Sequence, residues 1–119
     1  MGDPSSRASA SADRRVRVVL VDDAEAVRRM LRLQLELDGR FEIVGEAGDG
    51  VAAIRVAADA NPDLLILDRQ MPRMTGLEAL PRIREVSPAT AVVLYTSDID
   101  TWIYQAAIAA GALDVVLKN

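Results

Sequence analysis

The sequence predicts an α/β domain with a doubly wound, five-stranded parallel sheet and helices on both faces. The main observation is that short β-branched apolar runs alternate with segments whose apolar residues recur at helical spacing, in the order (βα)₄β. The second is that right-handed crossovers between parallel strands leave few other topologies. The third is size, because 119 residues with 50% hydrophobic content suit one domain with a substantial core.

The first half of the chain contains three predicted strands and two predicted helices. Asp38-Gly39 is expected to end the first helix, and Asn61-Pro62 the second. The third strand is a compact apolar run, which is typical of a strand buried on both faces of a sheet. We expect strands over 16–21, 41–46 and 64–67, separated by helices over 24–37 and 51–59.

The first predicted helix is amphipathic. Its apolar residues at helical spacing are expected to face the sheet, and its charged residues are expected to face solvent. The apolar set is Val27, Met30, Leu31 and Leu35, and the charged set is Arg28, Arg29, Arg32 and Glu36.

The second half repeats the alternation. Thr75 and Glu78 form a T-x-x-E capping box that opens a helix reaching about Glu85. Pro81 lies inside this helix and removes one backbone hydrogen bond, so a kink is expected there. Gly111 is expected to be the C-cap of the last helix. The remaining elements are predicted as strands over 91–95 and 113–117 and a helix over 100–110.

Composition excludes several classes of function. Without histidine or cysteine there is no Ser–His–Asp or Cys–His nucleophile system and no Cys/His zinc site. The net charge of -4 and the scattered arginines argue against direct nucleic-acid binding. No apolar run approaches the roughly 18 residues of a membrane span, so a cytoplasmic protein is expected. Residues 1–14 lack apolar periodicity, and we expect them to form a disordered N-terminal tail.

Polar side chains follow four of the five predicted strands. In an open parallel sheet, the carboxyl ends of the strands share one edge, and ligands bind there. The expected cluster therefore draws on residues far apart in the chain. Its members are Asp22, Asp23, Asp68, Thr96, Ser97 and Lys118.

This cluster predicts a metal and phosphoryl site. Three neighbouring carboxylates, from Asp22, Asp23 and Asp68, need a compensating charge, and Mg²⁺ prefers such oxygen ligands. Lys118, the only lysine beside 13 arginines, would offer a compact cation to an anion, and Asp68 could act as the nucleophile. The alternative is that these are ordinary strand-end residues, with Asp23 as a helix N-cap.

Four motifs resemble a known family. They are V-L-V-D-D at 19–23, L-I-L-D-R-Q-M-P-R-M-T-G-L-E-A-L at 65–80, V-L-Y-T-S at 93–97 and A-A-G-A-L-D-V-V-L-K at 109–118. The sequence is similar to the receiver domain of bacterial two-component response regulators. The resemblance implies a flavodoxin-like strand order of 2-1-3-4-5. It also implies a fifth helix after Lys118, so we expect 15–119 to be a receiver domain truncated after its fifth strand.

The same resemblance implies the metal ligands. Asp23, Asp68 and the backbone carbonyl of Gln70 would bind Mg²⁺ directly, and Asp22 would act mainly through water. Asp68 would take its phosphoryl group from a phosphohistidine of a sensor histidine kinase, which fits a chain that has no histidine of its own.

Roles around the phosphoryl group follow from the resemblance in the same way. Lys118 would contact a phosphoryl oxygen, Thr96 would donate its hydroxyl to another, and the small Ser97 would leave room for its backbone N–H. Gln70 and Asp98 would border the site and tune the rate of hydrolysis.

Departures from the family pattern leave alternatives open. Val115 stands where the family usually has a switch aromatic, and Arg73 and Thr75 replace a frequent Gly and Asp. A pseudo-receiver, an interaction module not controlled by phosphorylation, is therefore the main alternative. A haloacid-dehalogenase-like phosphatase would need a second Asp where Gln70 stands.

The expected partners follow from the family. The motifs look most like receivers fused to LuxR-type helix-turn-helix domains, which implies transcription regulation by an output domain or protein. Exposed apolar sheet surface would favour association, so a homodimer is left open. Trp102 and Tyr104 are expected to be partly exposed on the last helix, where they would either pack over its edge or meet a partner.

Overall fold

The computed structural model describes residues 14–118, and residues 1–13 of the predicted tail lie outside this range. Five parallel strands form one sheet in the order β2-β1-β3-β4-β5, which confirms the predicted fold class and strand order. The strand boundaries differ from the predicted ones by at most one residue. The strands are β1 (Val16–Val21), β2 (Phe41–Ala47), β3 (Leu64–Asp68), β4 (Ala91–Thr96) and β5 (Asp114–Leu117).

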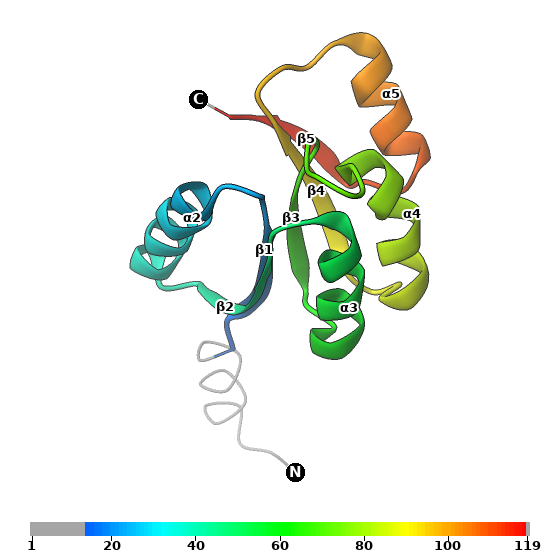
Figure 1. The fold of residues 1–119 in the computed structure, drawn as a ribbon. Coiled ribbons are helices and arrows are strands. Elements are labelled where there is room, and N and C mark those ends of the chain that lie inside the picture. The colour runs from blue at the N-terminus through cyan, green and yellow to red at the C-terminus, as the bar shows by residue number, and fades with distance from the viewer. Residues whose placement is uncertain (1–13, 119) are drawn as a thin grey trace, which may run out of the picture.

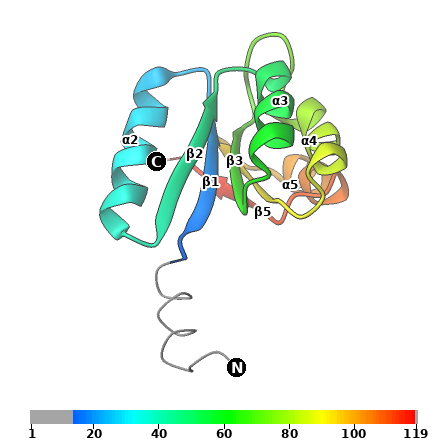
Figure 2. The same ribbon diagram turned by 90° about the horizontal axis from the view of Figure 1, so that it is seen from below.

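Helices lie on both faces of the sheet (Figures 1 and 2). One face carries α2 (Glu25–Asp38), which packs against β1 and β2. The opposite face carries α3 (Gly50–Ala60), α4 (Gly76–Val86) and α5 (Thr101–Ala109), which follow one another across the sheet. Within residues 14–118, no helix has the length and apolar character needed to cross a membrane.

The main core lies between the sheet and the three helices α3, α4 and α5. Alternate residues of the central strands point into it, and small residues on the helices let them approach the sheet closely. Aliphatic side chains build this core, as the low aromatic content of 3% requires. Its fully buried members include Val19, Leu65, Leu67, Val92, Leu94, Ala53, Ala57, Ala79, Leu80, Ile83 and Ala107.

The prediction that β3 is buried on both faces is wrong for one face. Leu64 and Ile66 are only half-buried, and Tyr95 of the neighbouring strand β4 is half-buried beside them. The reason is the position of α2, which covers β1 and β2 and leaves β3, β4 and β5 without a helix on this face in the described part of the chain.

Helix α2 is rotated relative to the predicted orientation. Leu31 is buried as expected, but Met30 is 45% exposed. Arg28, expected in solvent, is half-buried, and its Nε donates to Glu46 at 3.0 Å. Arg32 also donates to the Glu46 carboxylate. Burial alone would raise the pKa of Glu46, but hydrogen bonds from Arg32 and Arg28 outweigh it and hold the pKa below its usual value.

Polar side chains cap three of the four described helices. The predicted capping box is confirmed, because Thr75 Oγ1 accepts from the Glu78 N–H at 3.2 Å and Glu78 Oε1 accepts from the Thr75 N–H at 2.9 Å. The carboxylates of Asp49 and Asp100 cap α3 and α5. Helix α4 continues through Pro81, and the kink there stays a prediction. The C-cap of α5 is Ala110, one residue before the expected Gly111.

The start of α4 touches the backbone at the end of β3. The Gly76 N–H donates to the Arg69 carbonyl at 2.8 Å. A Cβ atom at position 76 would lie 2.1 Å from the carbonyl oxygen of Asp68 and 3.0 Å from the Arg69 Cα. Only glycine allows this approach, because both of those atoms belong to the backbone and cannot turn away.

The substitution Gly76→Ala should therefore lower the free energy of unfolding by about 1–3 kcal/mol, the usual cost of overpacking a tight contact. Gly48→Ala is the matched control, since its nearest neighbour would be the Arg28 side chain at 3.7 Å. Urea denaturation of both variants measures the difference. Equal stabilities of the two variants would show that the chain relaxes around the added methyl group.

Arg73 lies in the same loop and has a left-handed backbone conformation, with φ of +69°. Its guanidinium pairs with Asp49 at 3.1 Å, which links the loop to the N-terminus of α3. A glycine, which is frequent at this position in the receiver domains that the sequence resembles, suits the same conformation, because a side chain is strained there.

We expect Arg73→Gly to be more stable than Arg73→Ala by about 1 kcal/mol, although both variants lose the ion pair with Asp49. Both variants lack the long side chain, so the comparison isolates the backbone conformation. Thermal unfolding followed by circular dichroism measures it. A more stable Arg73→Ala would contradict the observed φ.

Candidate functional site

Three carboxylates meet at the carboxyl edge of the sheet. Asp22 and Asp23 follow β1, and Asp68 ends β3, the strand beside β1. One oxygen from each carboxylate can be chosen so that all three lie within 4.8 Å of one another. Asp22 and Asp68 are buried, and Asp23 is exposed. This arrangement suits a small cation that meets two enclosed carboxylates and one open to solvent.

Lys118 lies between the two buried carboxylates. Its Nζ donates to Asp22 Oδ2 at 2.7 Å and to Asp68 Oδ1 at 3.0 Å. The backbone N–H of Lys118 donates to the Thr96 carbonyl at 2.7 Å, and this bond fixes Lys118 beside β4. The ammonium also lies 5.4 Å from the centre of the Tyr95 ring, within the range of a cation–π contact. The last described residue is therefore held by three strands of the sheet.

Burial and charge act in opposite directions on this pair. Burial raises the pKa of Asp68 and the nearby Asp22 adds to the rise, so that the hydrogen bond from Lys118 does not bring it back to its usual value. Burial lowers the pKa of Lys118, but hydrogen bonds to Asp22 and Asp68 outweigh it and leave the pKa raised. Both pKa values are therefore raised, which disfavours the ionised form of Asp68 and favours that of Lys118. The effects on charge are opposite because one ammonium serves two carboxylates: the lysine gains two partners, and Asp68 has only a share of one.

Asp22 is held by two hydrogen bonds, and it is not the N-cap residue of α2. Its Oδ1 accepts from the Ala24 N–H at 2.9 Å, and its backbone carbonyl accepts from Arg28 Nη1 at 2.6 Å. The N-cap residue of α2 is Ala24, which has no capping side chain. The alternative that Asp23 is an ordinary N-cap is therefore wrong, and its carboxylate stays free to face the cluster.

The remaining predicted residues surround the carboxylates unequally. Thr96 is buried at the end of β4, and its Oγ1 accepts from Arg69 Nε at 3.2 Å. Ser97 and Gln70 are exposed in the loops after β4 and β3. Of these two, Gln70 also reaches the cluster through its backbone, which forms a hydrogen bond that lowers the pKa of Asp68.

Three residues around the site were not predicted from the sequence. They are Arg28, which holds the Asp22 carbonyl, Arg69, which holds Thr96, and Tyr95, whose ring lies beside Lys118. Arg69 was detectable, because it directly follows Asp68 and therefore leaves the strand at the same edge. Tyr95 and Arg28 carry no such signal: one occupies a strand position and the other a helix position assigned to solvent.

The charges in the cluster do not balance. Asp22, Asp23 and Asp68 contribute three negative charges and Lys118 one positive charge, which leaves -2 when all four groups are ionised. Neighbouring guanidinium groups do not supply the difference, because Arg28 pairs with Glu46 and Arg69 pairs with Asp98. An oxygen-lined site with this excess suits a hard divalent cation such as Mg²⁺.

Comparison with known proteins fits this geometry. A sequence profile described as "Response regulator receiver domain" matches residues 18–119. The chain belongs to the response regulator receiver domain family. It is similar to the transcriptional regulatory protein LiaR of Bacillus subtilis, with 42% identity over 105 residues, 87% of this chain and 49% of LiaR. It is also similar to a protein-glutamate methylesterase/protein-glutamine glutaminase of Geobacter sulfurreducens, with 38% identity over 88% of this chain and 28% of that protein.

Solved structures show the same receiver fold. The signal receiver domain of the putative response regulator NarL from Mycobacterium tuberculosis superposes with a TM-score of 0.84 at 34% identity, covering 88% of this chain and 85% of that one. The relatives include LuxR-family regulators, one of them from Aurantimonas sp.. The chain spans about half the length of LiaR and little more than a quarter of the methylesterase, so it corresponds to their receiver segment.

The raised pKa of Asp68 gives a stability prediction for this receiver domain in a metal chelator. Because folding disfavours the ionised carboxylate, Asp68→Asn should raise the free energy of unfolding at pH 7, on the order of 1 kcal/mol. The advantage should shrink as the pH falls through the raised pKa, where wild-type Asp68 becomes neutral as well.

Urea denaturation at several pH values measures this difference. Asp59→Asn on the exposed side of α3 is the control, and we expect its stability to match the wild type throughout. A less stable Asp68→Asn at pH 7 would mean that the pairing with Lys118 dominates over burial and the charge of Asp22.

Proposed function

We propose that this receiver domain accepts a phosphoryl group on Asp68, with Mg²⁺ bound at the neighbouring carboxylates. The observation that carries the proposal is the charge arrangement: three acids and one lysine within contact distance, with an uncompensated charge of -2. A structural ion pair needs one acid for one base. The extra carboxylates are explained if a cation and an anion bind there together.

The chain's own residues would divide the work of binding. The carboxylates of Asp23 and Asp68 and the carbonyl of Gln70 would hold Mg²⁺, and Asp22 would act through water. When bound, this ion supplies positive charge against the phosphoryl oxygens. Burial of Asp22 and Asp68 limits the competing solvation of the site by water.

Asp68 would act as the nucleophile. One of its carboxylate oxygens attacks phosphorus as the bond between phosphorus and the ring nitrogen of the donor histidine breaks. The electron pair of that bond leaves with the nitrogen, and the product is an aspartyl phosphate. Lys118 already donates to Asp68, so its ammonium would follow the new charge onto a phosphoryl oxygen.

Thr96 would contribute a hydrogen-bond donor. In the structure its Oγ1 accepts from Arg69, which leaves the hydroxyl proton available for a phosphoryl oxygen. Ser97 is small, so its backbone N–H would be accessible to the same group.

A sensor histidine kinase would be the phosphoryl donor, and an output domain or protein would receive the signal. LiaR is named as a transcriptional regulatory protein, and the shared receiver segment makes transcription regulation the proposed output for this chain as well. Phosphoryl transfer to Asp68 would then act by changing the contacts of the receiver with that output.

Incubation with a small-molecule phosphoryl donor, with and without Mg²⁺, tests the proposal. Intact-protein mass spectrometry should show one added phosphoryl group in the wild type with Mg²⁺, and only background without it. Asp68→Asn should gain none, and Asp59→Asn, which keeps every residue of the cluster, should match the wild type. Equal phosphoryl gain in Asp68→Asn and the wild type, or none in either, would instead support a pseudo-receiver that phosphorylation does not control.

A further inference from the structure

Arg69 connects the carboxyl edge of the sheet to the loop before α5. Its Nε donates to Thr96 Oγ1 at 3.2 Å, and its Nη2 donates to Asp98 Oδ1 at 2.9 Å. The two ends of this contact differ in exposure, because the Arg69 side chain is 14% exposed and the Asp98 side chain is 72% exposed. One guanidinium therefore joins a buried hydroxyl of the site to a carboxylate on the surface.

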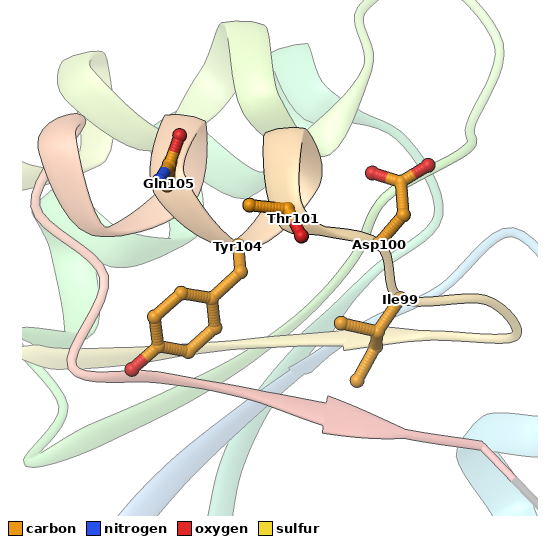
Figure 3. A pocket seen from close by; sticks show the side chains of 5 residues that line it. All are labelled: Ile99, Asp100, Thr101, Tyr104 and Gln105. Atoms are coloured by element: carbon orange, nitrogen blue, oxygen red, sulfur yellow. The ribbon is translucent and has the colours of Figure 1, made fainter.

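The surface end of this contact lies at the start of α5. Asp98 stands two residues before Asp100, whose Oδ1 caps the helix by accepting from the Ile103 N–H at 3.1 Å. A groove of about 460 Å³ follows along the same segment and is lined by Ile99, Asp100, Thr101, Tyr104 and Gln105 (Figure 3). Trp102 is exposed on the first turn of the helix. A displacement of Asp98 would therefore move the segment that contains both the helix cap and the lining of this groove.

We propose that Arg69 is a positioning residue that couples the occupancy of the anion site to the start of α5 through Asp98. The inference rests on the proposed phosphoryl acceptance at Asp68 and adds the route by which α5 senses it. Arg69 is directly bonded to Asp68 in the chain, and its side chain holds the hydroxyl that faces the incoming anion.

The chemistry of the two contacts favours a switch of partners. A phosphoryl group offers three strong acceptor oxygens, and a guanidinium binds such oxygens through its planar fork of N–H donors. The exposed carboxylate of Asp98 is a weak competitor, because water and salt screen it. When Arg69 or Thr96 turns toward the anion, Asp98 loses its partner, and the loop that leads into α5 loses a tether to the sheet.

Val115 stands where the family usually has a switch aromatic, and this difference makes the route through Arg69 more important. Val115 is a buried aliphatic residue that packs in the main core, and it offers no aromatic ring to move between two positions. Among the residues that the structure describes, Arg69 forms a polar contact between the edge of the site and the segment before α5.

Trp102 is the only tryptophan of the chain, so its indole N–H gives a single reporter signal on α5. The test is a titration of the full chain with beryllofluoride and Mg²⁺, followed by ¹H–¹⁵N NMR. Backbone amides near Asp68 report binding, and the Trp102 indole reports the response of α5. In the wild type we expect both signals to shift with the same saturation curve.

Asp98→Asn should separate the two signals. The affinity for beryllofluoride should change by less than about fivefold, since an exposed ion pair contributes little, but the indole shift should fall toward zero. Arg69→Lys, which keeps the charge and loses the fork, should also bring the indole shift toward zero but weaken beryllofluoride binding more than Asp98→Asn does. The indole shift of the double variant should be no smaller than that of either single variant. Glu25→Gln is the matched control, because Glu25 is also 72% exposed and pairs with Arg29 on α2.

Two outcomes overturn the inference: an unchanged indole shift in Asp98→Asn or Arg69→Lys, or a wild-type indole that does not move while the site saturates. Failure of the wild type to bind beryllofluoride with Mg²⁺ would count against the proposed function itself, so the two failures are distinguishable.

Discussion

The bridge that Lys118 makes between Asp22 and Asp68 is the interaction on which the site depends. Two buried carboxylates so close together repel each other, and the ammonium offsets this repulsion in the absence of a metal. The bridge also joins distant parts of the chain, since 96 residues separate Lys118 from Asp22. The strand order makes it available: β1 lies beside β3, which places the two acids at neighbouring strand ends.

The surroundings of the bridge are built to keep the acids in place. Arg28 of α2 donates to the backbone carbonyl of Asp22, and the N–H of Gly76, at the start of α4, donates to the carbonyl of Arg69, the residue after Asp68. The backbone at or beside each buried acid is therefore bonded to a helix on a different face of the sheet. A site with few protein ligands needs such support, because a fixed backbone limits where its carboxylates can point.

Most of the fold could be predicted from local patterns, and the errors lie where contacts cross between elements. The strand over 16–21 and the Thr75–Glu78 capping box depend on neighbouring residues, so the sequence alone was sufficient. The half-exposed face of β3 depends on where α2 lies, which no residue of β3 encodes. The strand order was available only through resemblance to a family, since helical and strand periodicity do not rank strands within a sheet.

The site divides in the same way. The sequence was sufficient to predict one cluster at the carboxyl edge, because parallel strands end at the same edge of a sheet. Its members are Asp22, Asp23, Asp68 and Lys118. The hydrogen-bond partners of Arg28 and Arg69 could not be predicted from the sequence. A long guanidinium side chain can reach several acceptors, and the packing of the folded chain determines which of them it meets. Arg28 was assigned to solvent by helical periodicity, yet Glu46 at the end of β2 draws it inward.

The position of Lys118 also has a consequence for covalent labelling. It is the only lysine side chain in the sequence, so an amine-acylating reagent meets a single side-chain target, and that target lies inside the site. Burial lowers the pKa of this lysine, but its two carboxylate partners raise the pKa by more than burial lowers it. The net rise keeps the nitrogen protonated and therefore slow to react. Acylation would thus remove the one cation that separates Asp22 from Asp68, and its rate would measure how firmly those two acids hold it.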